Sequence, residues 1–117
     1  MNTRSSKAKG RRLQNQIRDI LRETFPKLEE DDIKSQTMGM TGEDIVLSPA
    51  AKREIPYSFE CKNVERLNIW QAIEQSESNC ESRTPVVVMK RNRSETYVVF
   101  NLNKFIDLIR RENDKTK

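Results

Sequence analysis

With 117 residues, the chain is about the length of one domain, which excludes a protein of two active lobes. Its 22 Lys and Arg outnumber its 18 Asp and Glu, and the resulting net charge of +4 favours polyanionic partners. Histidine is absent, which excludes an imidazole base, a Ser-His-Asp relay and a His-liganded metal. The two cysteines are too few for a disulfide framework, and no apolar run is long enough to cross a bilayer. Catalysis, if any, must use carboxylates, lysines, hydroxyls, thiols or a metal bound by oxygen.

The charge distribution divides the chain into three parts. The first twelve residues are basic and contain no acid, so we predict a flexible basic arm over residues 1–12. The alternative is a solubilising tail, which is the commoner fate of a short run of charge. We expect one folded domain over residues 13–110 and a polar, frayed tail over residues 111–117.

The domain is predicted to begin with an amphipathic helix. Leu13, Ile17 and Leu21 recur at helical spacing, which predicts a helix over residues 12–24. Gln14 lies on the flank of the apolar face of this helix, so its amide can point toward a cleft rather than into bulk water.

Two β-prone segments follow, after a region in which a first strand is only weakly signalled. Residues 45–47 and 57–62 are predicted to form an antiparallel hairpin with a long turn. Because successive side chains alternate across a strand, Glu60 and Lys62 share one face of the second segment with Ser58, opposite an apolar face. That apolar face contains Tyr57, Phe59 and Cys61.

The second half of the chain supplies a crossover. A helix is predicted over residues 67–80, and the uninterrupted apolar run of residues 86–89 is typical of a central strand covered on both faces. A strand over residues 97–100 and a last helix over residues 102–109 complete the order α-β-β-β-α-β-β-α. Because a helix between two strands permits parallel pairing, the fold class is α/β, a mixed β-sheet flanked by helices.

Asp44, Glu60 and Lys62 form the candidate site. Asp44 begins one strand and precedes Glu60 by enough chain for a strand and a turn, so the two carboxylates can meet. Mg²⁺ takes one or two carboxylates together with waters and substrate phosphate, and the backbone carbonyl of Cys61 could add another oxygen. Lys62, on the same face as Glu60, would lie near the scissile phosphate and stabilise the negative charge that develops there. An exposed Glu/Lys pair on a strand is ordinary, so the isolated motif is weak evidence.

The arrangement of these residues resembles the PD-(D/E)XK nuclease superfamily, and especially its small Holliday-junction-resolvase-like and phage-type endonucleases. The resemblance runs over residues 9–109 and is carried by Gly42-Glu43-Asp44-Ile45, by Phe59-Glu60-Cys61-Lys62-Asn63, and by Trp70 and Gln75 on the following helix. It implies a restriction-endonuclease-like core, with Asp44 and Glu60 as metal-binding acids and Lys62 as the catalytic lysine. It also implies that Gln75 is the helix residue that supports the site.

The chain departs from the family pattern at two positions. Lys9-Gly10 followed by Gln14 resembles the first-helix motif of resolvases, which usually carry glutamate at the position of Gln14. An amide oxygen can still ligate or bind a metal water, so Gln14 is a possible support for the site. Glu43 replaces the proline that names the family, and we expect its side chain to face solvent, opposite to Asp44. Cys61 is expected to be a small core residue rather than a nucleophile.

Together with the candidate site, the resemblance implies a Mg²⁺-dependent DNA endonuclease, with Mn²⁺ as a substitute metal, acting on branched DNA in the manner of a Holliday-junction resolvase. DNA contacts are expected from seven basic residues, namely Lys7, Lys9, Arg11, Arg12, Lys90, Arg91 and Arg93. Cutting two strands implies a homodimer, held together by Trp70 or Phe25. We expect no organic cofactor, no membrane partner and a location in the cytoplasm of a phage-infected or prokaryotic cell. The alternatives are a DNA-binding module without catalysis and an RNA nuclease.

Overall fold

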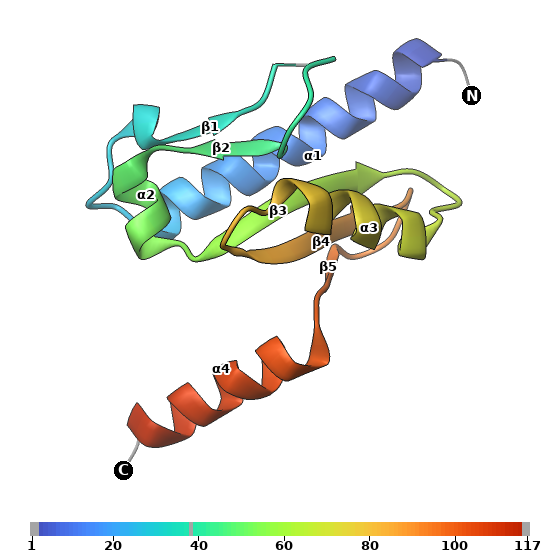
Figure 1. Ribbon diagram of the computed structural model, residues 1–117. Helices are drawn as coiled ribbons and strands as arrows, with labels where there is room; N and C mark the ends of the chain where they lie inside the picture. Colours follow the sequence, from blue (N-terminus) through green and yellow to red (C-terminus); the bar gives the residue numbers. More distant parts are fainter. Residues whose placement is uncertain (1–2, 38, 116–117) are drawn as a thin grey trace.

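The computed structural model describes residues 3–37 and 39–115 (Figure 1). Helix α1 spans Thr3–Thr24 and places Leu13, Ile17 and Leu21 in the core. It is longer than the predicted helix, because the residues expected to form a flexible arm are helical from Thr3 onward; residues 1–2 lie outside the described part. Lys and Arg are good helix formers, so a basic segment next to a helix extends it readily.

The strands form two small sheets. A short 3₁₀ helix, Glu30–Asp32, leads into β1 (Ile33–Ser35), which pairs antiparallel with β2 (Ile45–Leu47). The second sheet has the order β3-β4-β5 and contains β3 (Tyr57–Asn63), β4 (Thr84–Lys90) and β5 (Tyr97–Val99).

The predicted hairpin between residues 45–47 and 57–62 is therefore wrong. The supposed turn contains helix α2 (Pro49–Glu54), whose first turn is capped where the backbone N–H of Ala51 donates to Ser48 Oγ at 3.1 Å. A proline at the first helical position favours this start, because its missing N–H has no helical partner in any case. The helix carries the chain away from β2 before β3 begins.

The second sheet is mixed, as predicted. Helix α3 (Ile69–Asn79) is the crossover between β3 and β4, which run parallel, and β5 is antiparallel to β4. The apolar run of residues 86–88 is buried in the central strand β4. The predicted α/β class, with sheets flanked by helices, is confirmed, and it is compatible with a restriction-endonuclease-like fold.

The two faces of β3 are covered by different helices. Phe59 and Cys61 pack with Leu13 of α1 in the main apolar core, which also contains residues of β1, β2, α2 and β4. Glu60 lies on the opposite face and contacts Asn79 of α3. The polar face of β3 is therefore enclosed between the sheet and α3.

Helix α4 (Leu102–Lys115) extends away from the rest of the chain (Figure 1). None of its residues is buried, and the apolar side chains of Leu102 and Ile109 are 69% and 49% exposed. It includes most of the segment predicted to be a frayed tail, of which residues 116–117 lie outside the described part. Within the described residues, no helix is both long and apolar enough to cross a bilayer.

Candidate active site

Asp44 lies just before β2 and is hydrogen-bonded to β3, although β2 itself pairs with β1. The backbone N–H of Asp44 donates to the carbonyl of Phe59 at 3.1 Å, and the N–H of Cys61 donates to Asp44 Oδ2 at 2.6 Å. Since the N–H and C=O of one residue point to the same edge of a strand, the Cys61 carbonyl also faces Asp44. These bonds bring the carboxylates of Asp44 and Glu60 close enough to interact electrostatically.

Lys62 lies beside the buried glutamate. Its Nζ is 3.6 Å from Glu60 Oε2, and its side chain is 27% exposed whereas that of Glu60 is 7% exposed. The ammonium is therefore placed between the buried carboxylate and solvent, where it can reach an incoming anion.

Burial makes the two acids difficult to ionise together. Burial first, and then the charge of Asp44, raises the pKa of Glu60 to about 7, against the opposing influence of Lys62. Burial also raises the pKa of Asp44, although the Cys61 N–H, the Gln14 amide and Lys62 favour its charged form. Two carboxylates in such surroundings repel each other unless a cation or a proton is present.

Gln14 and Glu60 each have an oxygen without a partner. Gln14 Oε1 and Glu60 Oε1 are buried and accept no hydrogen bond from the described residues, although the Gln14 amide bonds Asp44. Unpaired buried oxygens are costly, and a hard divalent cation prefers such ligands. Within residues 3–37 and 39–115, no three His, Cys, Asp or Glu side chains are arranged so that they alone could hold a metal ion. A cation held here would therefore use the two carboxylates with Gln14 Oε1, the Cys61 carbonyl or water.

Helix α3 brings Asn79, not Gln75, to the carboxylates. Asn79 hydrogen-bonds Glu60 and lowers its pKa, whereas Gln75 is exposed and its side chain bonds no described residue. The inward positions of α3 are Ala72 and Ser76, and Asn79 continues their spacing. This spacing on the helix could have identified Asn79 from the sequence.

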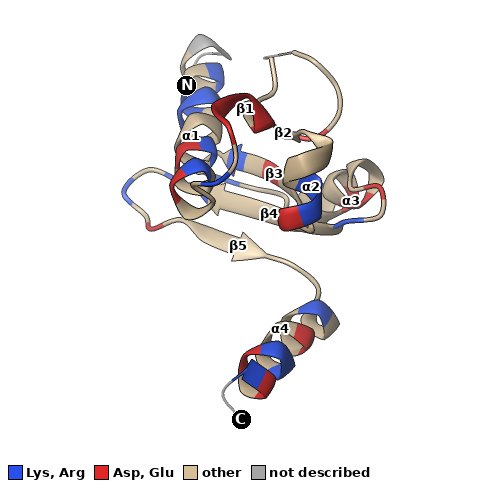
Figure 2. Cartoon of the chain, turned by 90° about the vertical axis from the view of Figure 1, so that its left-hand side faces the viewer, with Lys and Arg blue, Asp and Glu red and all other residues tan. Residues whose placement is uncertain are grey.

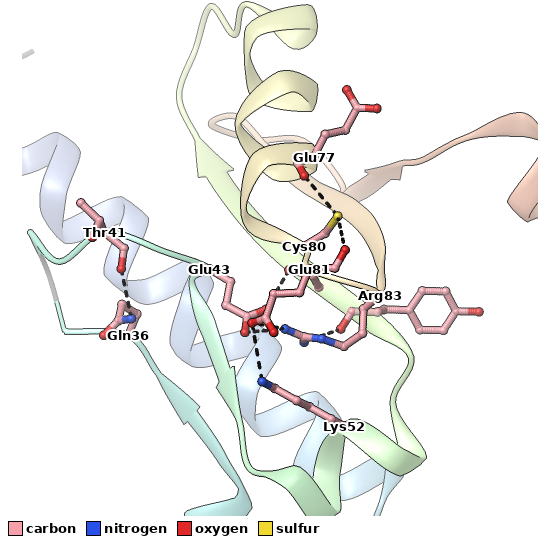
Figure 3. Close-up of polar contacts among 10 residues, drawn as sticks. Gln36, Thr41, Glu43, Lys52, Glu77, Cys80, Glu81 and Arg83 are labelled. Atoms are coloured by element: carbon pink, nitrogen blue, oxygen red, sulfur yellow. Dashed lines mark hydrogen bonds and ion pairs between the residues drawn. The ribbon is translucent and has the colours of Figure 1, made fainter.

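Glu43 does not face solvent, which corrects the prediction for this residue. Its carboxylate is 12% exposed and lies 2.7 Å from the guanidinium of Arg83, which is 7% exposed (Figure 3). Ser58 Oγ donates to Glu43 at 2.7 Å, and Arg83 also donates to the carbonyl of Tyr57 at 3.2 Å. This cluster fixes the residue before Asp44 against β3 and the start of β4. Arg83 carries no local sequence signal, because its partner lies 40 residues earlier.

The residues predicted to contact DNA are not equally available. Lys9 is buried, with Nζ 3.9 Å from Glu65 Oε2 and no hydrogen bond from Nζ to a described residue. Lys90 Nζ donates to the carbonyls of Arg91 and Ser94. The other predicted contacts are exposed on α1 and on the turn between β4 and β5, where Figure 2 shows basic residues; they are Lys7, Arg11, Arg12, Arg91 and Arg93.

Cys61 is buried as predicted, and burial raises the pKa of its thiol, so the thiol stays protonated. The polar groups that the structure brings together here are therefore two carboxylates, one amine and an amide.

Comparison with known proteins identifies the family. A family model described as "Phage putative PDDEXK endonuclease" matches residues 5–116. The curated proteins and the solved structures contain no significant match. Because the family match covers nearly the whole chain, the protein belongs to this phage endonuclease family and to the PD-(D/E)XK superfamily.

Proposed function

We propose that this endonuclease hydrolyses DNA phosphodiesters with Mg²⁺, or Mn²⁺ in its place, held by Asp44 and Glu60, and with Lys62 at the scissile phosphate. The observation that carries the proposal is the buried carboxylate pair, with an unpartnered oxygen on Glu60 and an ammonium 3.6 Å from its other oxygen. A buried acid pair of this kind has no evident structural benefit, because it costs stability when no cation is bound.

The residues divide the chemistry as follows. When bound, the cation would supply a Lewis acid for phosphate and water. Asp44 is oriented for ligation by its bond from the Cys61 N–H, and Gln14 presents an amide oxygen beside it. Lys62 binds a non-bridging phosphate oxygen and stabilises the charge that grows there as water attacks phosphorus. The attacking water forms the new P–O bond and loses a proton to solvent, while the bond to one ester oxygen breaks and that oxygen takes up a proton from solvent. Because the nucleophile is water, no covalent enzyme intermediate forms.

The proposal is tested by digesting linear, branched and single-stranded DNA with magnesium, manganese or calcium. We expect cleavage with the first two and binding without cleavage in calcium. Lys62→Ala should abolish cleavage and leave binding in calcium nearly intact, whereas the matched Lys34→Ala, at an exposed lysine on β1, should cleave normally. Cleavage by Lys62→Ala at the wild-type rate would contradict the proposed role. If the wild-type protein and both variants bind DNA equally and none of them cleaves it, the result would favour a DNA-binding module.

We further propose branched DNA as the preferred substrate. The support is the resemblance of Lys9-Gly10 and Gln14 to the first-helix motif of resolvases, together with the exposed basic residues of α1 and of the β4–β5 turn. Faster cleavage of a four-way junction than of its linear arms is the expected result. Preference for RNA of the same sequence would instead favour an RNA nuclease. The family description also suggests action in the cytoplasm of a phage-infected cell.

A homodimer is the assembly that we propose, on the evidence of α4. This helix lines a small cavity together with Pro56, Tyr57 and Thr84, and Leu108 is the apolar side chain that it contributes there. Leu102 and Ile109 of the same helix remain exposed. An amphipathic helix normally buries its apolar face, so a second copy is the expected cover. A duplex has two strands to cut, and two copies provide two sites.

An apolar groove of about 480 Å³ lies next to the start of α4 and offers a place for the helix of a partner. It is lined in part by Trp70, Ile73 and Phe100. Light scattering should give the mass of a dimer for the wild-type chain and for the control Asn103→Glu. Ile109→Glu should give a monomer. A monomeric wild-type protein at micromolar concentration would exclude the dimer.

A further inference from the structure

One row of side chains connects the proposed catalytic lysine to the far edge of the sheet. In the sheet register, Lys62 of β3 is opposite Met89 of β4, and Met89 is opposite Tyr97 of β5. Directly opposed residues on neighbouring strands point to the same face of a sheet. Tyr97 therefore shares the face of Lys62, and two strand spacings put their Cα atoms about 10 Å apart.

A cavity of about 600 Å³ opens at Met89 and Tyr97. Its lining includes the apolar Leu67 and Ile69, the basic Arg66 and Arg91, and the acidic Glu95. A volume of several hundred Å³ is typical of a site for a small organic ligand. The ring of Tyr97 is 59% exposed and can stack on a planar group.

The wall of this cavity is held in place by its own polar contacts. Glu65 Oε2 accepts from the backbone N–H of Asn92 at 2.7 Å and lies 3.9 Å from Lys9 Nζ, and Lys90 bonds two carbonyls of the β4–β5 turn. Glu65 and Lys90 therefore already have polar partners within the protein. The side chains of Arg66 and Arg91 form no hydrogen bond or ion pair with the described residues, so they remain available to an anion.

We propose that this cavity binds an unpaired DNA nucleotide next to the scissile phosphate, with its base on Tyr97 and its phosphate at Arg66 and Arg91. A planar base fits the aromatic and apolar lining, and a phosphate fits the two arginine side chains that have no partner among the described residues. The inference rests on the proposed function, because it assumes that the same strand reaches Lys62. It deepens that function by making a single-stranded segment part of the substrate.

The test measures binding in calcium, by fluorescence anisotropy, to a blunt duplex and to the same duplex with a short single-stranded tail. We expect Tyr97→Ala to weaken binding of the tailed DNA roughly tenfold and to leave the blunt duplex unchanged, since a stacked base loses its platform. Tyr97→Phe should bind as wild type. Val98→Ala, at a 55% exposed neighbour on the other face of β5, is the matched control and should change neither affinity.

A second measurement uses 2-aminopurine in the tail, whose fluorescence should fall when it stacks on Tyr97 and should not fall with Tyr97→Ala. Equal losses on both DNAs, or no loss on either, would overturn the proposal. A loss confined to an RNA tail of the same sequence would overturn the assignment to DNA. Cleavage of the same DNAs is measured separately with manganese, so an inactive protein that shows the tail-dependent loss contradicts the nuclease proposal and leaves the binding pocket supported.

Discussion

The ion pair between Glu43 and Arg83 provides a direct test of how the site is held. Replacing Arg83 by Met removes the guanidinium 2.7 Å from a carboxylate that is only 12% exposed and leaves Ser58 as its remaining hydrogen-bond donor. Removing one partner of a buried pair costs about 3–5 kcal/mol, because the other charge stays buried and unpaired. At about 4 °C per kcal/mol for a domain near this size, the melting temperature should fall by about 12–20 °C.

The matched variants separate the lost charge from lost packing. Glu43→Gln combined with Arg83→Met leaves no uncompensated charge, so the double variant should be more stable than Arg83→Met alone. Arg53→Met, at an exposed arginine on α2, should change the free energy of unfolding by less than about 0.5 kcal/mol. Urea unfolding followed by circular dichroism measures the wild type, Glu43→Gln, Arg83→Met, the double variant and Arg53→Met. A cost below about 1 kcal/mol for Arg83→Met, or strictly additive costs in the double variant, would refute the reasoning.

Three further predictions concern the carboxylates and the basic surface. Because the pKa of Glu60 is raised to about 7, the folded chain still holds this proton at pH values where the unfolded chain, with a pKa of about 4.5, has lost it. The free energy of unfolding of the cation-free protein should therefore fall as pH rises from about 4.5 to 7. The rise in melting temperature on adding calcium should therefore be larger at pH 8 than at pH 5.5, and equal rises would contradict this coupling. Asn79→Ala should weaken calcium binding in calorimetry, because Glu60 loses a bond to its charged form, whereas Gln71→Ala on the exposed side of α3 should not. Arg12→Ala should weaken DNA binding and make the slope of log affinity against log salt concentration shallower by about one. Lys9→Met, at a buried lysine, should leave this slope unchanged.

Local patterns predicted much of the second sheet. The uninterrupted apolar run of residues 86–89, of which 86–88 are buried, marked the central strand, and the alternation in β3 separated Cys61 from Glu60. The position of α3 between two strands predicted their parallel pairing, which the register confirms. These features follow from residues close in sequence, so one stretch of chain is enough to reveal them.

Other features depend on contacts between distant residues. The pairing of β2 with β1 rather than β3 depends on a weakly signalled strand and on α2, which occupies the expected turn. The rotation of α3 about its axis, which presents Asn79 and exposes Gln75, is set by packing on β4. In the sequence, only the spacing from Ala72 and Ser76 distinguishes Asn79 from Gln75, which lies one turn earlier.

From the sequence alone came the absence of histidine chemistry, the α/β class and the prediction that Asp44, Glu60 and Lys62 act together. The tertiary structure decided how Asp44 reaches β3, through the N–H of Cys61, and what lies behind it, the ion pair of Glu43 with Arg83. The physical reason is that side-chain alternation and hydrophobic periodicity are local properties, whereas desolvation, ion pairing and strand choice depend on which distant segments exclude water together.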